Sequence, residues 1–113
     1  VWCDEARVRD RVPAARLTRA WVLRRRRSHA ATAVRVELAL AGPGAHPGIR
    51  ARALAGGCAR VLAGLGRMAL GGLGAVAGRG LVHRARGARL VARGSGMAAA
   101  AVGRGAHREY GRP

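Results

Sequence analysis

The segment between residues 32 and 69 constrains the fold most, because it carries the two clearest periodic patterns in the chain. Its first part alternates apolar side chains with polar or small ones, a period of two that is typical of a strand with one buried face. The alternating apolar residues are Val34, Val36, Leu38 and Leu40. We therefore predict a short strand here, followed by chain breaks at Gly42-Pro43-Gly44 and at Pro47-Gly48.

The second part of this segment has the periodicity of a helix. Over residues 49–69, apolar side chains recur at three- and four-residue steps, so they share one side of a helix. The apolar positions are Leu54, Cys58, Val61, Leu65 and Met68. The arginines on the opposite side are Arg52, Arg60 and Arg67. The pattern predicts an amphipathic helix, and its commonest use is to pack on a sheet.

These two elements predict a small α+β protein of marginal stability. The chain has 113 residues, no phenylalanine and 18 glycines. Few large rings are therefore available for a core, and the glycines add backbone entropy that folding must overcome. We expect residues 1–93 to form a single, partly ordered domain and residues 94–113 to form a flexible basic tail.

Shorter patterns suggest further elements on either side. Pro13 suits the first turn of a helix, and we predict a helix over residues 13–27. The arginine run at 24–27 closes this helix, where positive charge is electrostatically favourable. Asp4 and Glu5 suggest a cap for a short turn before it.

The C-terminal part contains weaker signals. Two apolar pairs flank arginine-rich sequence around Gly87, which predicts a small hairpin. The pairs are Leu81 with Val82 and Leu90 with Val91. Gly94, Ser95 and Gly96 have the composition of a flexible linker.

Arginine dominates the charge, with 22 basic residues, none of them lysine, against five acidic residues and a net charge of +17. Such a chain attracts polyanions at low salt whatever its fold. Because arginine, alanine and glycine share GC-rich codons, our first interpretation is a GC-biased product or fragment with no specific biochemical role. The alternative is a small basic protein that binds nucleic acid, RNA foremost, through its arginines.

Two arginine clusters are the candidate phosphate contacts, because planar guanidinium groups fork onto phosphate oxygens. Trp21 lies one turn before Arg25 and is placed to stack on a base. The simpler interpretation is a solvated helix end with its tryptophan packed inward. The predicted nucleic-acid-binding residues are Arg24, Arg25, Arg26, Arg27, Arg84, Arg86, Arg89 and Arg93.

A weaker hypothesis is contact with a membrane. The helix over residues 49–69 separates apolar from arginine-bearing sides, as helices lying on anionic membranes do. Residues 61–78 are nearly uncharged, but Arg67 interrupts them at a cost of roughly 2.5–3.5 kcal/mol for insertion. Contact with the surface is thus favoured over a span.

Catalytic and cofactor chemistry find little support in the sequence. The four histidines lie far apart, without zinc-ligand spacing to either cysteine. The segment starting at Gly72 matches the dinucleotide pattern G-x-G-x-x-A. No strand precedes it, however, and no acid follows about 20 residues later. We predict no enzyme activity, no cofactor, no metal site and no small-molecule substrate.

The two cysteines, Cys3 and Cys58, are too few for a disulfide framework. We expect both to be reduced thiols, with pairing as the alternative in an oxidising compartment. The sequence assigns no localisation.

Overall fold

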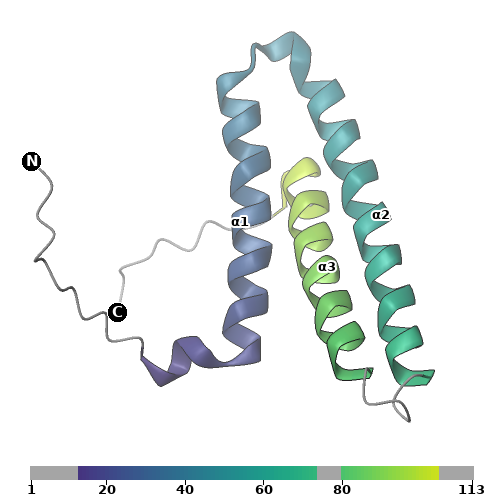
Figure 1. Cartoon of the computed structure of the whole chain (residues 1–113). Coiled ribbons are helices and arrows are strands. Elements are labelled where there is room, and N and C mark those ends of the chain that lie inside the picture. The colour runs from purple at the N-terminus through teal and green to yellow at the C-terminus, as the bar shows by residue number, and fades with distance from the viewer. Residues whose placement is uncertain (1–12, 74–79, 105–113) are drawn as a thin grey trace, which may run out of the picture.

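The computed structural model describes residues 13–73 and 80–104, and every regular element in these ranges is helical. Figure 1 shows α1 and α2 running in opposite directions, with α3 between them. The helix α3 packs against both of the others, whereas α1 and α2 touch little. The elements are a 3₁₀ turn Ala14–Leu17, α1 Arg19–Leu40, a 3₁₀ turn Pro43–Ala45, α2 His46–Leu73 and α3 Gly80–Ala101.

The predicted α+β class is therefore wrong, and the strand expected over residues 34–40 is the end of α1. Val34 is buried and Leu38 packs against the core, but Val36 is 49% exposed and Leu40 is 84% exposed. Only every fourth residue of the alternating series thus faces inward, which is a helical period. The alternation arose because apolar residues also occupy the solvent side of this helix.

The predicted first helix is correct in type but wrong in extent. Pro13 precedes the short 3₁₀ turn, and the Thr18 side chain then caps α1 by accepting a hydrogen bond from the Trp21 backbone N–H at 3.3 Å. The helix continues through the arginine run at 24–27 to Leu40. Those arginines lie inside a helix and do not close one. The turn suggested by Asp4 and Glu5 lies outside the described residues.

The predicted chain break at Gly42-Pro43-Gly44 is confirmed, but the one at Pro47-Gly48 is wrong, because both residues lie in the first turn of α2, where proline is tolerated. α1 ends at Leu40, and Gly42 leads into the turn Pro43–Ala45. The Nε2 atom of His46 lies 2.9 Å from the Leu38 carbonyl oxygen and 3.2 Å from that of Ala41. As a donor to these oxygens, His46 satisfies carbonyl groups that the end of α1 leaves without helical partners.

The helix predicted over residues 49–69 is present within the longer α2, but its inward face differs from the predicted one. Gly57, Gly64 and Gly71 are buried, whereas Leu65 is 50% exposed and Leu54 is 40% exposed. The seven-residue spacing of these glycines places them on one stripe of the helix. The predicted side is correct for Val61 and Met68, which pack against α3, and wrong for the leucines, because close backbone approach at the glycines decides this packing.

The hairpin predicted around Gly87 and the linker predicted over residues 94–96 are both wrong, because α3 runs without interruption through them. Residues 94–101 of the predicted tail are likewise helical, and residues 105–113 lie outside the described residues. Gly80, Gly87 and Gly94 form a second seven-residue stripe. These glycines mark a packing surface and do not interrupt the helix.

The two glycine stripes face each other and form what we call the glycine seam. A Cβ atom built on Gly64 would lie 2.7 Å from the Gly87 carbonyl oxygen, and one built on Gly87 would lie 2.5 Å from that of Gly64. Backbone therefore meets backbone here, and the side chains of Val91 and Met68 fill the flanks, so neither glycine has room for a Cβ atom of its own. The seam consists of the facing pairs Gly57 with Gly94, Gly64 with Gly87, and Gly71 with Gly80.

The third helix joins through another close contact. Gly96 of α3 lies against the Arg27 carbonyl oxygen and the Ala30 side chain of α1. Farther along, all three helices meet in one small cluster, with Leu38 and Met97 packed against it. The buried members of that cluster are Ala31, Val34, Ala53, Ala100 and Ala101. The interior is thus built from small side chains at short helix separations.

Candidate nucleic-acid interface

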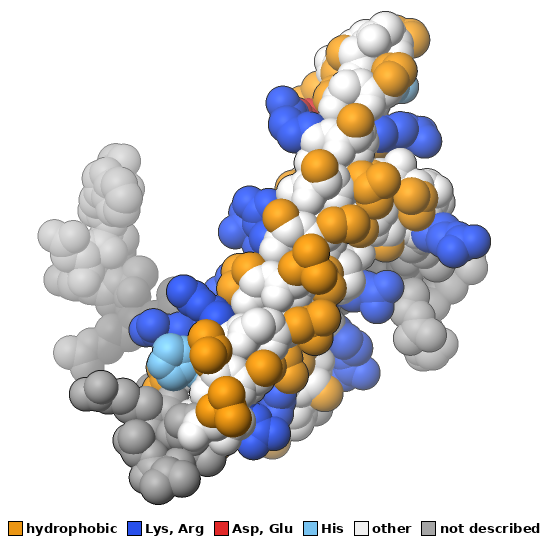
Figure 2. Space-filling model, turned by 90° about the vertical axis from the view of Figure 1, so that its right-hand side faces the viewer, with side chains coloured by type: hydrophobic (Ala, Val, Ile, Leu, Met, Phe, Trp, Pro, Cys, Tyr) orange, Lys and Arg blue, Asp and Glu red, His pale blue; other side chains and the backbone are white. Residues whose placement is uncertain are grey.

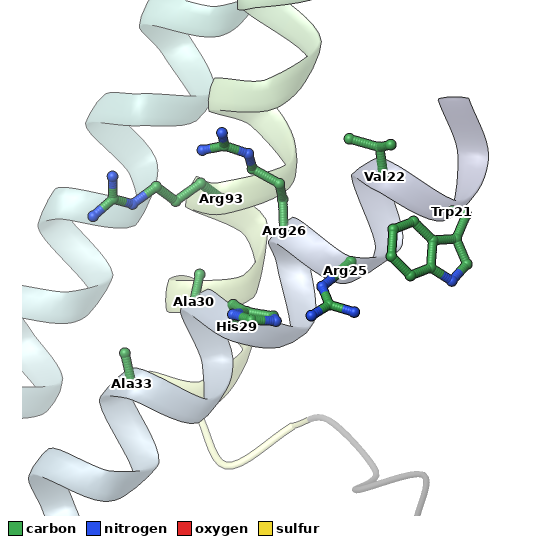
Figure 3. Close-up of a pocket in the computed structure, with 8 residues that line it drawn as sticks. All are labelled: Trp21, Val22, Arg25, Arg26, His29, Ala30, Ala33 and Arg93. Atoms are coloured by element: carbon green, nitrogen blue, oxygen red, sulfur yellow. The ribbon is translucent and has the colours of Figure 1, made fainter. Parts of the chain in front are cut away.

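A groove of about 390 Å³ lies beside the contact of α1 with α3. Its walls come from both helices, and its apolar part is formed by Val22, Ala30 and Ala33 (Figure 3). The polar lining comes from Arg25, Arg26 and His29 of α1 and from Arg93 of α3, and Trp21 completes it. We call this feature the arginine groove.

Helix geometry separates the four consecutive arginines of α1. Neighbouring residues on a helix point about 100° apart, so a run of four cannot form one patch. Arg25 and Arg26 line the arginine groove, whereas Arg24 and Arg27 are exposed elsewhere. The structure therefore brings together two of these four predicted residues.

The predicted arginines of α3 also divide into two groups. Arg86, Arg89 and Arg93 recur at three- and four-residue steps, and Arg93 reaches the groove. This is the side of α3 that carries Gly96, which contacts α1. Arg84 instead lies against the position of Gly71, so its stem packs beside the glycine seam.

The groove has an aromatic residue at one end. The Arg25 guanidinium carbon lies 5.0 Å from the centre of the Trp21 ring, within the range of a cation–π contact. Figure 3 shows Trp21 beside Arg25, with Arg93 projecting from the neighbouring helix. Trp21 is half-buried. Its ring is therefore partly packed against the protein, as the simpler interpretation predicts, and partly accessible to a ligand, as the nucleic-acid interpretation predicts.

Among the residues that the structure describes, no carboxylate lines the groove. Glu37 is the only acidic residue between positions 13 and 104, and its carboxylate forms an ion pair with Arg52 of α2. Glu37 lies near the other end of α1, more than two turns beyond His29. The groove arginines therefore have no carboxylate partner within the described ranges, which suits a site for an anionic ligand.

The described residues offer no cluster for metal binding: nowhere in residues 13–73 and 80–104 do three histidine, cysteine or acidic side chains come together. His29 has arginines for neighbours in the groove, and Cys58 is an exposed free thiol on α2. The dinucleotide-like segment that starts at Gly72 falls partly outside the described residues.

The sequence identified all three groove arginines, but not that they line one groove. That shared groove depends on α3 running alongside α1, with Gly96 and Ala100 at the contact. The helical spacing of Arg89, Arg93, Gly96 and Ala100 was the available signal, because it places arginines in line with small packing residues. His29, which the sequence offered no reason to select, also lines the groove.

Comparisons with known proteins give no relative: no family model, no curated protein and no solved structure matches this chain.

Proposed function

We propose that this protein binds nucleic acid, RNA foremost, by holding backbone phosphates in the arginine groove. The observation that carries this proposal is that Arg25, Arg26 and Arg93, from two helices, line one groove whose described lining contains no carboxylate. Arginine suits this role because its planar fork of donors matches the oxygens of a phosphate. Arg86 and Arg89 extend the same side of α3 and lengthen the path available to a phosphate backbone.

Trp21 favours nucleic acid over other polyanions as the ligand. An aromatic ring beside an arginine gives a base a surface on which to stack, and every base has such a face. The apolar groove wall formed by Val22, Ala30 and Ala33 also suits the flat part of a nucleotide better than a sulfated sugar. A single-stranded RNA fits this combination, since its bases are free to leave the backbone path.

Removing the groove charges should weaken RNA binding much more than removing the same charge elsewhere. The test variant is R25Q/R26Q/R93Q, and the matched control is R24Q/R50Q/R104Q, which lowers the net charge equally at exposed positions outside the groove. Loss of three phosphate contacts should lower affinity on the order of 50-fold at physiological salt. Fluorescence anisotropy with a labelled single-stranded RNA measures both variants.

The control decides whether a site exists. We expect R24Q/R50Q/R104Q to stay within about threefold of the unaltered protein, because it lowers only the general attraction. Equal losses in the two variants would show that total charge alone governs binding. The protein would then have no nucleic-acid site, as the interpretation of a GC-biased product without a specific role predicts.

Trp21→Ala should separate RNA from heparin. A stacked base contributes about 1–3 kcal/mol, so RNA affinity should fall by roughly 5-fold or more. Heparin has no bases, and its affinity should stay within about twofold. Trp21→Phe keeps an aromatic face and should restore most of the RNA affinity, which distinguishes stacking from damage to α1. A parallel loss for both ligands in Trp21→Ala would rule out the stacking role.

A further inference from the structure

The outward side of α2 carries larger apolar side chains than the interior of the protein does. Helical spacing places six residues on this side, which we call the outer α2 face. Its leucines are largely exposed, with Leu62 at 70% and Leu73 at 82%. Figure 2 shows hydrophobic side chains in a row along the molecule, with arginines at the margins. The outer α2 face consists of Leu54, Cys58, Leu62, Leu65, Ala69 and Leu73.

The distribution of large and small residues is the reverse of that expected in water. The buried residues of α2 are three glycines with Ile49 and Ala53, and the helices meet through backbone contacts. In water, leucine is among the residues most often buried, and an extended exposed apolar strip marks an interaction site. Small residues between helices with large apolar residues outside are typical of helices packed in contact with lipid.

The length and composition of α2 agree with lipid contact. The arginines of the neighbouring α3 decide whether α2 crosses the membrane or lies on its surface. Within the described residues, Pro43–Leu73 is long and apolar enough to cross a membrane, and 17% of its most apolar window is buried. The glycine seam holds α3 alongside this helix from Gly57 to Gly71. A span would therefore carry the arginines of α3 into the hydrocarbon, where charged side chains are strongly disfavoured.

We propose that the outer α2 face lies on the surface of an anionic lipid bilayer. Its leucines enter the boundary between headgroups and acyl chains, with the helix axis parallel to the membrane plane. Arg60 and Arg67 lie on the opposite side of this helix, so the attraction to lipid phosphates comes from the arginines at the margins of the row in Figure 2. Charge complementarity selects this occupant, because a second copy of a chain with charge +17 would be repelled and an anionic surface attracted.

Cys58 provides a direct test, since it is an exposed thiol within the outer α2 face. The full chain with Cys3→Ser is labelled at Cys58 with an environment-sensitive nitrobenzoxadiazole dye. Mixing with vesicles of phosphatidylserine and phosphatidylcholine should shift the emission to the blue, and spin labels near the top of the acyl chains should quench it. The control carries the dye at residue 28 (Cys3→Ser, Cys58→Ser and Ser28→Cys), an exposed position on α1, and should show no shift.

Paired charge variants complete the test. Leu62→Asp with Leu65→Asp should lower binding to the same vesicles at least tenfold. Ser28→Asp with Thr32→Asp makes the same charge change on α1 and should have an effect of about twofold or less. No blue shift at Cys58, an equal shift at residue 28, or equal losses in the two paired variants would each refute membrane docking. A blue shift without vesicles, together with a dimer in sedimentation, would instead assign the face to a second copy.

Discussion

Replacing Gly64 with alanine should lower the melting temperature of the protein by about 10 °C. The added Cβ would lie 2.7 Å from the Gly87 carbonyl oxygen and 2.9 Å from the Val91 backbone nitrogen. Neither backbone atom moves without separating α2 from α3, and overpacking of this kind costs typically 1–3 kcal/mol. In a domain of this size, 1 kcal/mol corresponds to roughly 4–8 °C. Circular dichroism at 222 nm during heating measures the transition.

Gly66→Ala is the matched control, two residues farther along the same helix. A Cβ atom there meets nothing within 4 Å, so alanine adds only helix propensity. We expect a gain of about 0.4–1 kcal/mol and a melting temperature raised by a few degrees. A lower melting temperature for Gly64→Ala together with a higher one for Gly66→Ala would establish the seam. A Gly64→Ala protein that melts with or above the unaltered chain would contradict it.

Raising the salt concentration from 50 to 200 mM should weaken RNA binding about 100-fold. The estimate counts five phosphate contacts, and each contact to a single strand contributes about 0.7 to the slope of log affinity against log salt. The five contributing arginines are Arg25, Arg26, Arg86, Arg89 and Arg93. A titration by anisotropy at several salt concentrations gives the slope.

The same titration on R25Q/R26Q/R93Q links the slope to the groove. Losing three contacts should make the slope shallower by about 2, whereas R24Q/R50Q/R104Q should leave it nearly unchanged. A slope that is the same in the unaltered protein and in the groove variant would mean that these arginines do not touch phosphate. The proposed site on α1 and α3 would then be wrong, and membrane contact through α2 would be unaffected.

Part of the fold was predictable because local chemistry decides it. Gly42 and Pro43 disfavour continuation of α1, and the pattern over residues 49–69 is long enough to specify a helix. The alternation at residues 34–40 was misleading because it is short, and the helix that contains it exposes half of its apolar members. Glycine-rich sequence in α3 suggested a hairpin and a linker, because glycine lowers helix propensity when it is considered alone.

The candidate site also combines residues that could be predicted from the sequence with an arrangement that could not. Each groove arginine was selected from charge, which is evident from the sequence. Their position along one groove was not, since it depends on the contact of Gly96 with Arg27 between two helices far apart in sequence. The outer α2 face was hidden for a related reason: Leu65 was assigned to the packed side of its helix, and it lies outside.

The sequence by itself determined the strongly positive charge of this protein, the break before α2 and the helical state of α2. The net charge is the same in every conformation of the chain. The break and the helix depend on residues that are close together in the sequence. The tertiary structure alone decided which side of α2 is buried, why α3 tolerates its glycines, and which three arginines line one groove. The physical reason is that a glycine destabilises an isolated helix and stabilises a pair of helices only when a second backbone approaches it. That approach is a property of two segments together, and neither segment carries it alone.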